Sequence, residues 1–176
     1  MSTHCAIFYK DHEGKCNGIF CHFNGMPDTT GDILYHHYQN EALVQQLIDL
    51  GGLLFIEEDI RDIVTFRAAL NHKMIDKKSQ SEGYQALTEM ERKKLCHYEL
   101  AKAWHPYQTK WSFSNEDKML EAYHHWDKTE FFFGSQYIYL YDTTKKGKNK
   151  WTIFYHGKTT LCHRNLTPSL IKKLSD

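Results

Sequence analysis

Apolar and β-forming residues gather in short runs near both ends of the chain. Residues 3–9 and 16–23 are rich in β-forming residues and flank a turn at 11–15, which predicts an antiparallel hairpin. Near the C-terminus, the alternating run 136–142 and the return strand 151–156 flank a lysine-rich loop. The pattern therefore predicts a second hairpin at that end.

The segment between the two hairpins carries helical signals. Thr29 or Thr30 is expected to cap one helix, and Asn40 is expected to cap the next, which ends at Gly51. Further helices are predicted to begin near Glu57, after the capping box Thr88-x-x-Glu91, near Ser114 or Asn115, and at Pro168 behind a Thr167 cap.

These elements define the expected fold class. Strands paired as hairpins at both ends, with helices between them, favour an α+β domain over a series of β-α-β units. We expect a mainly antiparallel sheet, built from N- and C-terminal hairpins and covered by helices from the middle of the chain. A length of 176 residues fits a single domain over residues 1–176. The order of the strands does not follow from the sequence.

Composition argues against several classes of protein. The 22 basic and 22 acidic residues cancel, whereas a dedicated nucleic-acid binder normally has a basic excess. Five cysteines without a CxxC pair argue against a disulfide framework and for a reducing compartment. The start MSTHCAIFYK lacks the apolar run of a signal peptide, and no window approaches the ~20 apolar residues of a membrane span. We therefore expect a cytoplasmic protein without a membrane partner.

The most specific stretch is CHFNGMP at 21–27, between a predicted strand and a predicted helix. Asn24, Gly25 and Pro27 favour a tight turn, because Asn and Gly tolerate positive φ. The alternative is an oxyanion hole, in which the Asn24 amide and the Gly25 N–H stabilise a negative charge. That alternative needs a nucleophile, for which Ser2 is the candidate at the N-terminus of the processed chain.

Histidine and cysteine provide two further candidates. The turn places His22 near His37 and Tyr38, where we expect it to organise the junction through hydrogen bonds; a metal ligand or general base is the alternative. A second candidate metal set comprises Cys5, Cys16, Cys21 and His22. Strand alternation puts Cys21 and His22 on opposite faces, and buried free cysteines are common in cores. We therefore expect no metal and no cofactor, and we assign no catalytic residue.

The predicted C-terminal hairpin carries a lysine-rich tip. Its four lysines are Lys145, Lys146, Lys148 and Lys150. Such a cluster can contact phosphate groups or an acidic protein surface, and the plainer interpretation is a solvated hairpin tip. We include the four lysines among the candidate binding residues.

Several features of the N-terminal third occur together. The chain begins Met1-Ser2-Thr3, carries the box CHFNGMP, and continues with Gly31, His37-Tyr38 and LVQQLIDLGGL at 43–53. In these features it resembles a family of small uncharacterised proteins of bacteriophages and prophages. Members begin Met-Ser-Thr-Arg and carry a box of the form Cys/Arg-His-Trp/Phe-Asp-Gly-Tyr-Pro. The run QYIYLYD, followed by Trp151, is similar to the closing strands of that family.

The resemblance covers residues 1–55 and, more weakly, residues 136–155. Three positions depart from the family's pattern: His4 replaces Arg, Asn24 replaces Asp, and Met26 replaces Tyr. An activity that depends on the family's carboxylate would therefore not carry over to this chain.

The resemblance implies a phage or prophage accessory protein that binds and inhibits a host component, such as a CRISPR effector of a defence system. We expect a host protein or ribonucleoprotein complex as partner, in the host cytoplasm, bound through aromatic anchors and a charged rim. The candidate binding residues are His22, Phe23, Asn24, Gly25, Pro27, His37, Tyr38 and the four lysines of the hairpin tip. One alternative is a small hydrolase that uses Ser2 or a histidine-based metal site. The other is a nucleic-acid-associated protein that uses the lysine loop.

Overall fold

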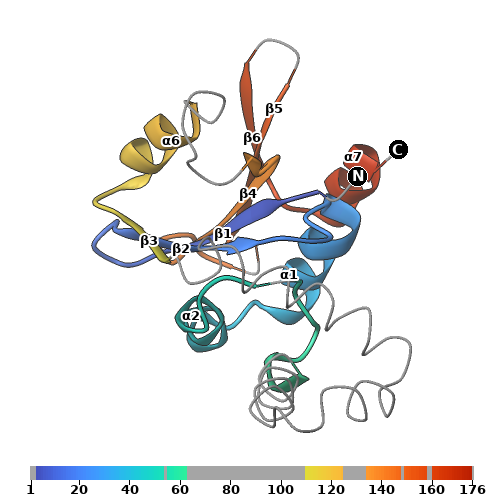
Figure 1. The fold of residues 1–176 in the computed structure, drawn as a ribbon, viewed down its shortest axis with the longest axis horizontal. Coiled ribbons are helices and arrows are strands. Elements are labelled where there is room, and N and C mark those ends of the chain that lie inside the picture. Colours follow the sequence, from blue (N-terminus) through green and yellow to red (C-terminus); the bar gives the residue numbers. More distant parts are fainter. Residues whose placement is uncertain are drawn as a thin grey trace, which may run out of the picture.

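A computed structural model of the chain places a mixed β-sheet between helices (Figure 1). It describes residues 3–53, 55–62, 110–124, 134–147, 149–157 and 160–175. The predicted loop 71–87 and the predicted Thr88 capping box lie outside these residues. Within them the architecture is the expected α+β class, with a sheet that is mostly antiparallel.

The sheet has six strands in the order β3-β2-β1-β4-β5-β6. The strands are β1 Cys5–Lys10, β2 Cys16–Cys21, β3 Lys110–Phe113, β4 Tyr137–Asp142, β5 Trp151–His156 and β6 Leu161–Asn165. Both predicted hairpins are confirmed, since β1 pairs with β2 and β4 with β5, each antiparallel.

The two hairpins join through β1 and β4 at the centre of the sheet. These strands are parallel, with Cys5 opposite Tyr137 and Lys10 opposite Asp142. A parallel pair at the centre is typical of strands that are covered on both faces. The continuous apolar run of β1, five buried residues in a row, reflects that position.

Each face of the sheet packs against helices. Alternate residues of β1, with Ile7 on one face and Phe8 on the other, enter two separate apolar clusters. The first face packs against η1 Pro27–Gly31, α1 Asp32–His37, α2 Glu41–Asp49 and α7 Pro168–Ser175, and the second against α6 Glu116–His124. In Figure 1, α2 and α6 accordingly lie on opposite sides of the sheet.

Three predicted helix caps are present. The side-chain oxygens of Asn40, Asn115 and Thr167 accept hydrogen bonds from backbone N–H groups in the first turns of α2, α6 and α7. Each cap satisfies one N–H donor that the helix itself leaves without a partner. Local capping chemistry was therefore a sound guide to where these helices begin.

Three sequence expectations need correction. Neither Thr29 nor Thr30 caps a helix, because the helical run begins earlier, at Pro27, as a single π-helical segment. The helix expected from Glu57 begins at Ile60 in the described part. Within the described residues, the helices that cover the first face lie in the N-terminal third and at the C-terminus, and only α6, on the second face, lies closer to the middle of the chain.

Two strands were not predicted. β3 alternates between exposed and buried positions but has only four residues, and β6 is largely exposed and shows no alternation. Both are edge strands, on the outer sides of β2 and β5.

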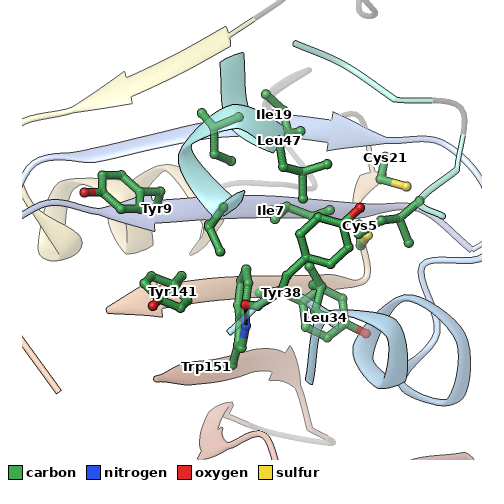
Figure 2. Close-up of a cluster of buried hydrophobic side chains, with 14 of the residues drawn as sticks. Cys5, Ile7, Tyr9, Ile19, Cys21, Leu34, Tyr38, Leu47, Tyr141 and Trp151 are labelled. Carbon is green, nitrogen blue, oxygen red and sulfur yellow. Dashed lines mark hydrogen bonds between the residues drawn. The ribbon is translucent and has the colours of Figure 1, made fainter. Parts of the chain in front are cut away.

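Buried aromatic side chains hold the connections between elements onto the sheet. The Trp151 indole donates to the Tyr38 carbonyl oxygen (2.8 Å), and the Tyr141 hydroxyl donates to the Gln39 carbonyl oxygen (2.9 Å). Figure 2 shows Tyr38, Tyr141 and Trp151 together in the first core cluster, beside Leu34. Aromatic residues make up 14% of the chain, and many of them are buried inside the fold. Within the described residues, no helix is long and apolar enough to cross a membrane.

Candidate functional site

The CHFNGMP box forms the junction between β2 and η1. Asn24 has a φ of 57°, the left-handed conformation that Asn adopts more readily than most residues. Its carbonyl oxygen accepts from the Thr30 N–H (3.2 Å), from the Thr30 hydroxyl (2.7 Å) and from the Thr29 hydroxyl. The two threonines thus close the turn rather than cap the helix.

Position 25 has no room for a side chain, so glycine is required there. A Cβ atom at this position would lie 2.7 Å from the His4 carbonyl carbon and 2.8 Å from the Cys5 nitrogen. The Gly25 N–H donates to the Thr3 carbonyl oxygen (2.9 Å), and its own carbonyl accepts from the buried Tyr139 hydroxyl (3.0 Å). An N–H that donates to Thr3 does not point at a substrate, so this geometry argues against an oxyanion hole.

His22 belongs to a cluster of rings at the start of the sheet. Its ring stacks on that of His4, with centroids 4.6 Å apart, and meets Phe23 edge-on at 4.0 Å. His4 Nδ1 in turn contacts the His22 carbonyl oxygen. His4, at the position where the resembling family has Arg, therefore packs on the box histidine, a contact the sequence alone did not suggest.

His37 and Tyr38 face different neighbours from His22. Tyr38 is fully buried and donates from its hydroxyl to the Glu57 carbonyl oxygen (2.8 Å). His37 is exposed, and its Nε2 lies 3.7 Å from a Glu58 carboxylate oxygen. Of these two candidate residues outside the box, Tyr38 is therefore part of the core, and His37 is an exposed histidine next to an acidic group.

The cysteines of the first hairpin are buried. Cys5 lies directly opposite Cys21 in the β1–β2 pair, and both side chains enter the first core cluster (Figure 2). Burial raises the pKa of the Cys5 thiol well above its ordinary value, and burial raises the pKa of Cys16 to about 12. Among the described residues, no group of three or more His, Cys, Asp or Glu side chains is arranged to hold a metal ion.

The lysines of the hairpin tip do not act as one cluster. Lys145 folds inward, and its ammonium donates to Asn165 Oδ1 (2.7 Å) and to the Thr152 hydroxyl. Burial lowers the pKa of Lys145 below its ordinary value. Lys150 lies over the Tyr141 ring at 5.5 Å, Lys146 is exposed, and Lys148 lies outside the described residues.

An ion-pair network at the other end of β1 and β4 was not predicted. The Lys10 ammonium lies 2.9 Å from Glu116 on α6 and 3.3 Å from Asp142 on β4. Burial acts to raise the pKa of Asp142, but hydrogen bonds from Thr144 and the charge of Lys10 outweigh it and lower that pKa. Only the register of the sheet brings these residues together, so no local signal could have revealed the network.

Charge is strongly segregated along the chain. Residues 3–62 carry ten acidic and three basic residues, whereas residues 134–175 carry one acidic residue and eight basic ones. The two segments therefore have formal charges of about −7 and +7, which cancel in the whole-chain total. A count by segment would have found this polarity.

Acidic residues of this segment lie on the helices that cover the first face and in the segment that follows them. We define the acidic layer by Asp28 on η1, Asp32 on α1, Glu41 and Asp49 on α2, and Glu58 in the segment that follows. The side chains of Asp32, Asp49 and Glu58 are 50%, 75% and 71% exposed. These carboxylates face solvent, and each also lies within 4 Å of a basic side chain of the protein: Asp32 near His36 (3.5 Å), Asp49 near Lys110 (3.8 Å) and Glu58 near His37 (3.7 Å).

Comparison of the chain with protein-family models, with curated proteins and with solved structures finds no match.

Proposed function

We propose that the protein is a phage or prophage accessory protein that binds and inhibits a host component through the acidic layer. The target class is a nucleic-acid-binding protein or ribonucleoprotein of a host defence system, such as a CRISPR effector. The exposure of Asp32, Asp49 and Glu58 in a segment of charge about −7 is the observation that carries this proposal. Proteins that bind nucleic acids present basic surfaces, and a layer of carboxylates is complementary to such a surface.

The box supports a binding role because its hydrogen bonds hold the helical layer in place on the sheet. Hydrogen bonds hold the β2–η1 junction together through the backbone of Asn24 and Gly25 and the hydroxyl of Tyr139. They fix the start of the helical layer on the sheet. A fixed layer presents its carboxylates in one arrangement, which lowers the entropic cost of binding a partner. Ser2, the nucleophile of the hydrolase alternative, lies outside the described residues.

The proposal predicts a charge-dependent host partner. We would capture partners from host lysate with tagged protein and compare the wild type with the triple variant D32N/D49N/E58Q. A control variant, E13Q/D117N/E121Q, removes the same charge from exposed positions outside the acidic layer. We expect wild type and control to enrich one nucleic-acid-binding complex and the acidic-layer variant to lose it. No enrichment over background, or equal capture by all three, would contradict the proposal.

A further inference from the structure

A groove lies between the end of β6 and α7. Its volume is about 460 Å³, and it is lined by Arg164, Asn165, Thr167, Ser169, Leu170 and Lys173. Two of these residues are cations, one on each element. Residues 143–175, which include β6 and α7, contain eight Lys and Arg and no Asp or Glu.

The acceptor atoms of the groove are already occupied from within the protein. Asn165 Oδ1 accepts from the Lys145 ammonium (2.7 Å), and Thr167 Oγ1 accepts from the Leu170 N–H (3.3 Å). With its oxygen held by Lys145, the Asn165 amide presents its NH₂ group on the opposite side. The Thr167 and Ser169 hydroxyls lie 3.2 Å apart, so one donates to the other, and Arg164 Nη1 donates to the His163 carbonyl oxygen (2.8 Å). The groove therefore still offers mainly donors: the remaining N–H groups of the guanidinium, an ammonium, an amide NH₂ and one hydroxyl.

A donor-rich site with two cations fits a ligand that carries only acceptors and negative charge. Phosphate oxygens meet that description, and Arg, Lys, Ser, Thr and Asn are the side chains that contact nucleic-acid backbones. Lys146 and Lys172 extend the positive charge beyond the groove on the β4–β5 connection and on α7. A repeated anion can contact cations on more than one element, which a single small anion cannot do.

Among the described residues, the acidic groups near the groove belong to neighbouring elements, and in the sequence Asp176 follows α7. Asp142 acts electrostatically on Lys145, and Asp28 lies on η1, which packs against α7. Neither carboxylate lines the groove. The positive charge of Arg164 and Lys173 is thus available to a ligand.

We propose that the β6–α7 groove binds the phosphodiester backbone of a nucleic acid, with Arg164 and Lys173 as the principal phosphate contacts. This inference does not rest on the acidic layer or on a host-protein partner. A failed capture experiment would leave it standing, and its own failure would leave the proposed function standing.

The test measures the affinity for labelled oligonucleotides. Fluorescence anisotropy would follow a fluorescein-labelled single strand of DNA, and separately its duplex, between about 50 and about 200 mM salt. The test variant is R164A/K173A. The matched control is K15A/K118A, which removes two exposed lysines outside the basic segment and changes the net charge by the same amount. Circular dichroism would check that each variant is folded.

We expect the wild type and the control variant to bind with a steep salt dependence. Affinity should fall about tenfold or more in R164A/K173A, and its salt slope for the single strand should decrease by about 1.4, or about 0.7 for each lost contact. Equal weakening in the two variants would show that overall charge is responsible and would overturn the assignment. Absent binding by the wild type, or equal affinity for polyglutamate of similar length, would also overturn it.

Discussion

At the scale of single residues, the strand-to-helix junction depends on space as much as on backbone conformation. The dipeptide Asn24-Gly25 was expected to tolerate positive φ at both positions, and only Asn24 uses it. Gly25 is needed because the backbone of His4 and Cys5 occupies the place of a side chain. The sequence indicated a turn correctly, but the close approach of β1 is a tertiary contact that the dipeptide does not encode.

We predict that Gly25→Ala destabilises the protein by about 1–3 kcal/mol, because its methyl group would meet backbone atoms that cannot rotate away. The control is Asn24→Gly, whose left-handed φ suits glycine, and it should change stability by less than about 1 kcal/mol. Urea denaturation followed by circular dichroism measures both. Equal stability of Gly25→Ala and the wild type would show that the junction relaxes freely.

At the scale of elements, three capping signals located helix starts correctly and the expected Thr29 or Thr30 cap was wrong, whereas long-range strand pairing could not be predicted. Asn40, Asn115 and Thr167 marked helix starts, since a cap acts within a single turn. Hairpin partners were predictable because their strands are neighbours in sequence. The parallel β1–β4 pair joins positions as far apart as Lys10 and Asp142, and no local pattern specifies that pairing.

The ion pair between Lys10 on β1 and Asp142 on β4 predicts that the stability of the fold depends on pH. The pKa of Asp142 is lowered in the folded state, so its contribution is present above the ordinary Asp pKa of about 3.9. That contribution is lost as the pH falls through the lower folded-state value. Asp142→Asn should therefore cost about 1–3 kcal/mol at pH 7, because it removes a charged hydrogen-bond partner of Lys10.

Urea denaturation at about pH 7, 5 and 3 checks this prediction. The difference between wild type and Asp142→Asn should be largest at neutral pH and should shrink toward pH 3. Asp117→Asn, an exposed acid on α6, is the control and should track the wild type. A constant difference in unfolding free energy between wild type and Asp142→Asn at all three pH values would mean that the carboxylate charge does not stabilise the β1–β4 pair.

At the scale of the whole molecule, zero net charge conceals an acidic layer and a basic groove. The sequence contains this information, but a whole-chain sum removes it, and the fold is needed to show which charges are exposed. Among the candidate residues of the box, Asn24 and Gly25 make hydrogen bonds within the β2–η1 junction. In the lysine-rich hairpin tip, Lys145 donates a hydrogen bond to Asn165, which lines the groove.

We propose that the acidic layer occupies the nucleic-acid-binding surface of a host protein. The most direct measurement is a displacement assay with the captured partner and its labelled nucleic acid. The competitor is the R164A/K173A variant, so that the basic groove does not bind the label itself. We predict that the anisotropy falls to that of free nucleic acid, and that adding D32N/D49N/E58Q to the competitor abolishes this effect. A stable complex of partner, labelled nucleic acid and competitor, with unchanged or increased anisotropy, would contradict the proposal.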